Sequence, residues 1–382
     1  MAKLDQICTL NMGQSPDSSS YNENGSGMPF FQGNADFGKT HPKVRVWCSA
    51  PTKIAHAGDV LISVRAPIGA LNIADRDCCI GRGLAALTVN EEICNKDYLW
   101  YAIASKVDEL NSKGTGSTFK AISKSVLAET EIPLPSLEEQ QSMAKQLAKI
   151  DELISLRKEQ LTKLDRLVKS RFIELFGDPM ENPMGWDRVN ISAVVGGKVS
   201  NGFFAKRDDY CDDGNVKVLG VAHVVNRMYS NVEDLPITNG TEADVAKYGV
   251  KYGDMLFCRS SLVAAGIGKA SIVPKDTPNN VLFECHVIRL PLALNKCVPE
   301  FMQVLSTTDY FRNQVIAQSK TATMTTIGQD GILKTDIILP PLELQKQFLK
   351  FVEQTDKSKL AIQQSLDKLE LLKKSLMQEY FG

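Results

Sequence analysis

The stretch closest to a catalytic motif in this 382-residue chain is residues 33–40. It fits the G-x-x-x-x-G-K-[ST] pattern of phosphate-cradling loops, with Lys39 in the lysine position. Such a loop must open a helix whose N-terminal amides face the phosphates, whereas here His41 and Pro42 lead into an alternating, strand-like run. A nucleotide-binding enzyme that uses Lys39 is therefore an alternative interpretation, which the surrounding sequence opposes.

Other catalytic patterns are thinner still. None of the four histidines has the spacing of metal ligands, and no Gly-x-Ser-x-Gly elbow occurs. The Asn-Pro-Pro-Tyr/Phe motif that holds a flipped adenine in methyltransferases is also missing, so methyl transfer would have to come from a partner. We expect no catalytic residue and no metal site, and we expect the nine cysteines to be reduced and mostly buried.

The composition is that of an ordinary globular protein. Hydrophobic residues make up 43% of the chain and its net charge is −1, so there is no bulk basic signal for nucleic acid. A protein that reads bases while a partner supplies most phosphate contacts could have this balance. No window approaches the roughly 20 apolar residues that a membrane span needs, and the expected location is the cytoplasm.

The elements that would position any site come from a tandem duplication. Residues 134–177 recur without a gap as residues 339–382, and 16 of these 44 positions are identical. In the first copy Ser136 can cap a helix that meets no Gly or Pro until Gly177. The pattern predicts one helix of about 40 residues, roughly 60 Å long, after each of two globular lobes.

Each predicted helix carries an apolar seam that is typical of a coiled coil, and its partner would be the other helix of the same chain. Antiparallel pairing would put the lobes at opposite ends. A scaffold that pairs helices but binds no DNA is the alternative. The residues expected to pair the helices are Leu147, Ile154, Leu161, Leu164 and Val168 in the first copy, and Val352, Ile362, Leu366, Leu369 and Leu376 in the second.

The lobes repeat more faintly. Gly58-Asp matches Gly253-Asp, and Arg65 and Arg259 each follow soon after, while the offset between the copies drifts along the chain. Such drift is typical of a fixed framework with variable surface loops. The loops are rich in Gln, Asn, Lys and Arg, which are side chains that reach base edges in DNA, although most such loops are only solvated turns.

In these features the chain resembles the DNA sequence-specificity (S) subunits of type I restriction-modification systems. The resemblance spans essentially the whole chain and is carried by the order of several short motifs, each weak alone. These motifs are the Gly13-Gln-Ser-Pro loop, Pro29-Phe-Phe-Gln-Gly, Gly58-Asp-Val-Leu-Ile-Ser, Thr118-Phe-Lys-Ala-Ile-Ser, and Ile132-Pro-Leu-Pro-Ser-Leu-Glu-Glu-Gln leading into the helix.

The resemblance implies an α+β fold with two mixed α/β target-recognition domains, separated by two long antiparallel coiled-coil helices in a pseudo-twofold repeat. The implied boundaries are a first recognition domain at 1–133, a central helix at 134–178, a second recognition domain at 179–338 and a C-terminal helix at 339–382. Each domain would read one half of a bipartite, asymmetric DNA site, and the helices would set the spacer.

The resemblance also implies partners: double-stranded DNA, two methyltransferase subunits that carry S-adenosylmethionine, and restriction subunits that use ATP and Mg²⁺. This chain would itself hold no cofactor and catalyse nothing. The residues expected near DNA in the first domain are Gln14, Ser15, Tyr21, Asn22, Gln32, Asn34, Lys39, Arg65, Ser117 and Thr118. Those in the second domain are Asn201, Lys206, Arg207, His223, Arg259 and Thr323.

Overall fold

The computed structural model describes residues 1–116 and 120–382. By its internal contacts the chain divides into two compact units. The first unit is Met1–Glu159 together with Gln363–Gly382, and the second is Gln160–Ile362. Each unit therefore contains one β-rich lobe, the start of one long helix and the end of the other.

The first lobe is built on two sheets of short strands. One has four strands in the order β2-β10-β7-β8 and the other has five in the order β3-β5-β4-β9-β6, with β4 and β9 parallel. A β1–β11 pair joins the start of the lobe to its end. The strands are β1 (Ala2–Lys3), β2 (Cys8–Met12), β3 (Tyr21–Asn22), β4 (Met28–Phe31), β5 (Val46–Cys48), β6 (Ile54–Ala55), β7 (Val60–Ser63), β8 (Leu71–Ile73), β9 (Cys78–Ile80), β10 (Leu84–Val89) and β11 (Glu131–Ile132).

Four short helices complete this lobe: α1 (Leu4–Ile7), α2 (Lys96–Ser105), α3 (Val107–Lys113) and α4 (Lys124–Ala128). The sequence predicts a single amphipathic helix near residues 96–110, but the structure breaks it at Lys106. The backbone of Lys106 leaves the helical region, with ψ near 5°, and α3 then continues with its own buried residue, Leu110.

The second lobe has the same kind of framework. Its four-stranded sheet has the order β13-β20-β16-β18, and a three-stranded sheet has the order β15-β14-β19, in which β14 and β19 are parallel. A β12–β23 pair and the sheet β17-β22-β21 complete it. The strands are β12 (Arg188–Asn190), β13 (Ser200–Asn201), β14 (Val216–Leu219), β15 (Ile237–Thr238), β16 (Asp254–Cys258), β17 (Ser260–Ser261), β18 (Ala270–Ile272), β19 (Val281–Phe283), β20 (Val287–Pro291), β21 (Lys320–Thr321), β22 (Thr325–Thr326) and β23 (Asp336–Ile338).

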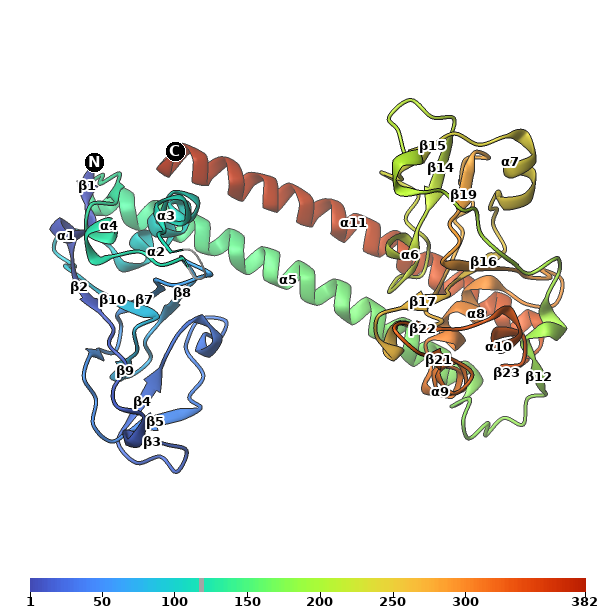
Figure 1. Ribbon diagram of the computed structural model, residues 1–382, viewed down its shortest axis with the longest axis horizontal. Coiled ribbons are helices and arrows are strands. Elements are labelled where there is room, and N and C mark those ends of the chain that lie inside the picture. The colour runs from blue at the N-terminus through green and yellow to red at the C-terminus, as the bar shows by residue number, and fades with distance from the viewer. Residues whose placement is uncertain (117–119) are drawn as a thin grey trace. The chain divides into compact units, whose positions relative to one another are not determined.

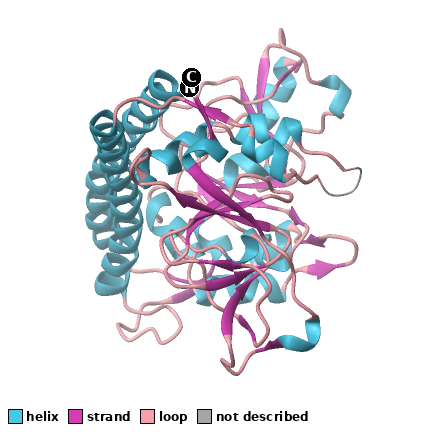
Figure 2. Cartoon of the chain, turned by 90° about the vertical axis from the view of Figure 1, so that its left-hand side faces the viewer, coloured by secondary structure: helices cyan, strands magenta, loops and turns pink. Residues whose placement is uncertain are grey.

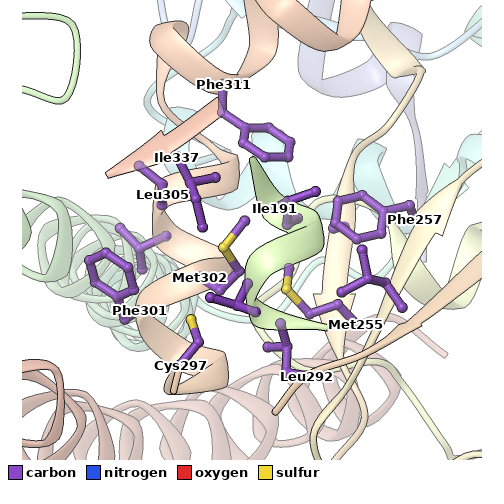
Figure 3. Packing of buried hydrophobic residues seen from close by; sticks show 14 of the residues in the cluster. Ile191, Met255, Phe257, Leu292, Cys297, Phe301, Met302, Leu305, Phe311 and Ile337 are labelled. Carbon is purple, nitrogen blue, oxygen red and sulfur yellow. The ribbon is translucent and has the colours of Figure 1, made fainter. Parts of the chain in front are cut away.

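The helices of the second lobe are α6 (Val221–Val224), α7 (Glu242–Tyr248), α8 (Pro299–Ser306), α9 (Asp309–Ala317) and α10 (Gln329–Leu333). Figure 2 shows the strands of the whole chain in magenta and the loops that join them in pink. The core packs α8 and α9 against the central sheet: Figure 3 shows Phe301, Met302 and Leu305 of α8 in the same buried cluster as Met255 and Phe257 of β16. This burial fixes the sheet that carries the surface loops.

The two long helices are α5 (Leu137–Phe176) and α11 (Leu342–Phe381), 40 residues each, as the sequence predicts. Ser136 caps α5 in a capping box: its hydroxyl accepts from the Glu139 amide at 3.3 Å, and the Glu139 carboxylate accepts from the Ser136 amide at 2.9 Å. The Ser136 hydroxyl, which donates to the Glu139 carboxylate at 2.7 Å, and the Ser136 amide together hold the pKa of Glu139 below its usual range. Gly177 ends α5 with φ of +76°, which only glycine adopts without strain.

Within each unit the helices pair in opposite directions (Figure 1). In the first unit Asp151 meets Lys373 at 2.6 Å and Lys158 meets Glu370 at 2.8 Å. In the second unit Asp165 meets Lys359 at 2.7 Å. Of the residues expected to pair the helices, Leu147, Val168, Val352 and Leu366 are buried and the other six are half-buried. Their assignment to the helix seam remains a prediction.

A repeated glutamine ties each long helix to the lobe that precedes it. Gln140 of α5 is fully buried, accepts from the Asn95 amide at 2.8 Å and donates to the carbonyl of Pro135 at 2.9 Å. Its counterpart Gln345 of α11 accepts from the Val298 amide at 2.8 Å and donates to Pro340 at 2.8 Å. The duplication therefore preserved the joint between lobe and helix at the level of single hydrogen bonds.

Candidate functional site

Four of the expected first-lobe residues surround the turn at residues 81–83, which we call the first crossing turn. Here the chain leaves β9, which lies parallel to β4, and crosses to β10 of the other sheet. The Gly81 amide donates to Phe31 at 2.8 Å and the Val64 amide donates to Gly83 at 2.9 Å. The turn is thus held from both sheets.

The predicted residues Gln14, Ser15, Gln32 and Arg65 lie against this turn. The Gln14 amide donates to Ile80 at 3.0 Å, and Ser15 Oγ accepts from the Arg82 amide at 3.3 Å. A side chain at Gly83 would collide with the carbonyl of Gln32, and Arg65 directly follows Val64. Gln14, Gln32 and Arg65 are exposed, so polar groups from three separate segments meet at one surface.

The second lobe repeats the arrangement at residues 284–286, the second crossing turn. The Glu284 amide donates to Leu219 at 2.9 Å, the Arg259 amide donates to His286 at 2.8 Å, and the Phe203 amide donates to Phe283 at 2.7 Å. Glycine is required in both lobes where the first loop passes the turn. A Cβ on Gly13 would lie 2.2 Å from Gly81 O, and one on Gly202 would lie 2.2 Å from Glu284 O.

Two exposed residues on these turns were missed by sequence reasoning, Arg82 in the first lobe and His286 in the second. His286 Nδ1 lies 3.2 Å from Ser260 Oγ, and the Arg82 side chain is exposed to solvent. Aligning β9 with β19 would have found them, because the two turns occupy matched positions in the repeat.

Arg65 and Arg259 each follow a Gly-Asp strand closely, but they do not occupy equivalent positions of the repeat. The Ile122 amide donates to Val64 at 2.9 Å, and the Ile327 amide donates to Arg259 at 3.0 Å, so Arg259 matches Val64. Neighbouring residues in an extended segment point to opposite sides, and the two arginines therefore differ in environment. Arg65 is exposed, whereas Arg259 is half-buried and donates from Nη1 to Cys285 at 3.1 Å.

Other predicted first-lobe residues are engaged within the first unit. Tyr21 is half-buried, donates its hydroxyl to Pro16 at 2.9 Å and packs on Phe30. Asn22 closes its own loop by bonding both the amide and the carbonyl of Ser26. Asn34 begins a single 3₁₀ turn, and Lys39 Nζ donates to Ser155 Oγ at 3.1 Å. Ser117 and Thr118 lie outside the described residues.

The predicted second-lobe residues occupy three places. His223 of α6 accepts from the Gly220 amide through Nδ1 at 3.0 Å, beside the Val221 amide that donates to Glu284 at 2.7 Å, so it lies next to the second crossing turn. Asn201 of β13 is half-buried, and its Oδ1 is enclosed and without a partner among the described residues. The other three residues of this group, Lys206, Arg207 and Thr323, are exposed, and Arg207 begins a 3₁₀ turn at Arg207–Asp209.

The context of residues 33–40 does not match a phosphate-binding loop. A 3₁₀ turn at Asn34–Asp36 is followed by irregular chain as far as β5, so Lys39 does not open a helix. The glycine amide that a phosphate would need at Gly38 instead donates to His41 at 3.1 Å. The geometry therefore gives no support to nucleotide binding at Lys39.

The surfaces around the two crossing turns present exposed amide, guanidinium and imidazole groups on backbone that is hydrogen-bonded to both sheets of its lobe. Such groups suit hydrogen bonding to base edges and phosphates. Burial raises the pKa of the Cys285 thiol in the second turn, so this cysteine adds no thiolate to that surface. The exposed groups around the turns can therefore donate hydrogen bonds to a ligand.

Comparison with known proteins identifies the family of this chain. The family model described as the type I restriction modification DNA specificity domain matches residues 1–166 and 183–371. The chain belongs to this family. The resemblance inferred from sequence is thereby confirmed, as is the α+β fold of two lobes with two long helices.

Individual members of the S subunit family are similar over different shares of the chain. A putative type I restriction enzyme MjaX specificity subunit from Methanocaldococcus jannaschii is 43% identical over 41% of this chain and 37% of its own length. The MjaVIII specificity subunit of the same organism is 25% identical over 77% of this chain and 71% of its own. The match to the MjaX subunit thus spans little more than a third of that protein.

The fold is shared by a crystal structure of a type I restriction-modification system S subunit from M. genitalium. The two chains superpose with a TM-score of 0.59 at 13% identity, covering all of this chain, 100%, and 95% of the other. No helix in the described part of this chain combines the length and apolar character that a bilayer crossing requires.

Proposed function

We propose that this chain is the DNA-reading subunit of a type I restriction-modification complex and catalyses no reaction itself. Each lobe, 1–133 and 179–338, reads one half of a bipartite DNA site through the surface around its crossing turn. The observation that carries this proposal is the pair of matched turns, each held by both sheets of its lobe and each surrounded by different exposed polar residues.

Further support comes from exposed leucine side chains on both long helices. Large apolar side chains that face solvent mark interaction surfaces when they gather on one element. We therefore propose that α5 and α11 dock two methyltransferase subunits, which bring S-adenosylmethionine, and that restriction subunits add ATP- and Mg²⁺-dependent steps in the cytoplasm. The exposed leucines are Leu156 at 45%, Leu167 at 48%, Leu360 at 61%, Leu371 at 68% and Leu372 at 47%.

The decisive experiment is long-read methylome sequencing of cells with and without the gene, with the methyltransferase subunits expressed. The proposal predicts a gapped adenine-methylation motif that disappears with the gene. An adenine methylation pattern that does not change on deletion would rule the proposal out.

The helices are proposed to set the gap between the half-sites. Inserting or deleting about four residues, one helical turn, near Gln160 should change the spacer and leave each half-site intact. A motif with unchanged spacing would show that the helices do not measure it, without touching the proposal that the lobes read DNA.

A further inference from the structure

A cavity of about 440 Å³ in the second unit is lined by an excess of positive side chains. It opens where β18 and α8 meet both long helices. Five of its lining residues are basic: Lys169, Arg227, Lys269, Arg312 and Lys359. The one carboxylate in the lining is Asp165, in a chain whose net charge is −1.

Four of the five basic residues have no carboxylate partner among the described ion pairs. Lys359 uses the available carboxylates, with Asp165 at 2.7 Å and Asp356 at 3.7 Å. Lys269 Nζ donates to the neutral amide oxygen of Asn226 at 2.7 Å, and Arg227 donates only to backbone carbonyls, at 3.3 and 3.4 Å. Among the described ion pairs, Lys359 is thus the one member of the set with a carboxylate partner.

Arg312 lines the cavity, and one of its guanidinium nitrogens has no hydrogen-bond partner among the described residues. Its Nη2 donates to the Ala265 carbonyl at 3.2 Å, while Nη1 is enclosed and has no hydrogen-bond partner among the described residues. Leaving a buried charged donor unpaired is costly, and a guanidinium suits the oxygens of a phosphate. Gln303, itself buried, holds the wall in place by donating to the carbonyl of Arg227 at 3.1 Å.

The lysine at position 269 is not repeated in the first unit. Ile267-Gly268-Lys269 matches Ile68-Gly69-Ala70, because the Gly268 amide donates to Cys258 at 2.8 Å and the Gly69 amide to the matched Ser63 at 2.9 Å. The framework therefore accepts alanine where the second unit has Lys269. A lysine that the fold does not require points to a ligand.

We propose that this cavity binds a phosphate group, held by Arg312, Lys269 and Arg227. The phosphate belongs either to the DNA backbone or to a free phosphate-bearing molecule. This site goes beyond reading a DNA sequence, because it recognises charge and the tetrahedral oxygens of phosphate and no base.

The test compares wild type with Lys269→Ala, which installs the residue of the first unit, and with Lys334→Ala, which removes an exposed lysine that does not line the cavity. Inorganic phosphate is titrated into the full-length chain by calorimetry, and circular dichroism checks folding. We expect Lys269→Ala to weaken phosphate binding about tenfold or more, as loss of a charged hydrogen bond would, and Lys334→Ala to change it less than about twofold.

A second titration with duplex DNA at several salt concentrations separates the two sources of phosphate. If the site holds the DNA backbone, Lys269→Ala lowers affinity evenly across sequences and reduces the salt slope by about one. If it holds a free phosphate, DNA binding is unchanged and only the phosphate titration responds. The proposal is wrong if Lys269→Ala and Lys334→Ala behave alike in both titrations, and the phosphate arm decides this even if the chain binds no DNA.

Discussion

The two units share the joint between lobe and helix but differ around the crossing turn. At the joint, Gln140 and Gln345 make the same bonds to an amide and to a proline carbonyl. At the turn, the residues Gly-Arg-Gly at 81–83 correspond to Glu-Cys-His at 284–286, and the backbone bonds that hold the two turns are matched. Buried bonds that the framework needs were kept after duplication, while exposed side chains that only a ligand would sense were free to diverge.

The units also differ in how tightly the end of the incoming helix is packed. In the second unit Phe176 meets Phe172, Phe301 and Phe348 with ring centroids 5.0, 4.8 and 5.6 Å away. In the first unit its repeat counterpart Phe381 meets Tyr98 at 5.2 Å and its neighbour Tyr380 at 6.2 Å. The start of each long helix thus makes the same polar bonds in both units. The end of the incoming helix makes more aromatic contacts in the second unit than in the first.

The largest expected change in stability comes from substitutions that remove this aromatic packing. Phe176→Ala should lower the free energy of unfolding by about 4 kcal/mol and Phe381→Ala by about 3 kcal/mol, because both leave cavities but Phe176 loses more aromatic contacts. Urea denaturation of each variant measures the difference. Ile173→Ala, at 44% exposed on the same helix, is the control and should cost far less. A larger loss for Phe381→Ala would reverse the comparison.

The next effect tests whether the joints are equivalent. Gln140→Ala and Gln345→Ala should each cost roughly 2–3 kcal/mol, because each strands a buried amide and a buried carbonyl. Denaturation of the two variants should give similar losses, and the exposed neighbour Gln141→Ala should be nearly neutral. A cost in only one unit would mean that the two joints are not energetically alike.

The free energy of unfolding is expected to depend on pH through Glu300. This residue is buried in the second unit and accepts hydrogen bonds from the hydroxyls of Tyr229 and Tyr252 at 3.1 Å each. Burial raises the pKa of Glu300 above its ordinary value of 4.5. A raised pKa favours folding while the group is protonated, so its contribution is present below about pH 4.5 and lost as pH rises through the folded pKa.

Glu300→Gln should remove this loss and flatten the stability profile above pH 4.5. Urea denaturation across pH, followed by tryptophan fluorescence with Trp186 reporting on the second unit, measures it. Profiles of the same slope for wild type and Glu300→Gln would show that Glu300 does not titrate differently on folding.

The smallest effect is expected at Lys39, whose bond to Ser155 is solvent-exposed. Lys39→Ala should change the free energy of unfolding by less than about 0.5 kcal/mol and leave ATP hydrolysis by the isolated chain at background, as for wild type. ATP hydrolysis by wild type that Lys39→Ala abolishes would revive the nucleotide-binding interpretation.

Much of the fold followed from sequence because its signals are local. The uninterrupted run between Ser136 and Gly177 contains its own cap, stop and seam, and it is one helix in the structure. The break at Lys106 was missed because α2 and α3 are separated by a change in one residue's backbone, which no proline or glycine announces.

The candidate site was less predictable because it is made by strand register. Gln14, Gln32 and Arg65 come together only through the crossing of β9 between two sheets, and a shift of one residue separates Arg65 from the position of Arg259. Arg82 and His286 carry no local motif. The cavity around Arg312 draws on several separate segments, and no spacing in the sequence reports it.

The central claim, one reader duplicated and then diverged, is tested most directly by methylome sequencing of cells whose chain carries the first lobe twice. Residues 1–133 replace residues 179–338, the helices stay intact, and the methyltransferase subunits are present. We predict a gapped motif whose two halves carry the same base sequence, namely one half of the wild-type motif. A folded, assembled chimera that still methylates both original halves would contradict the account.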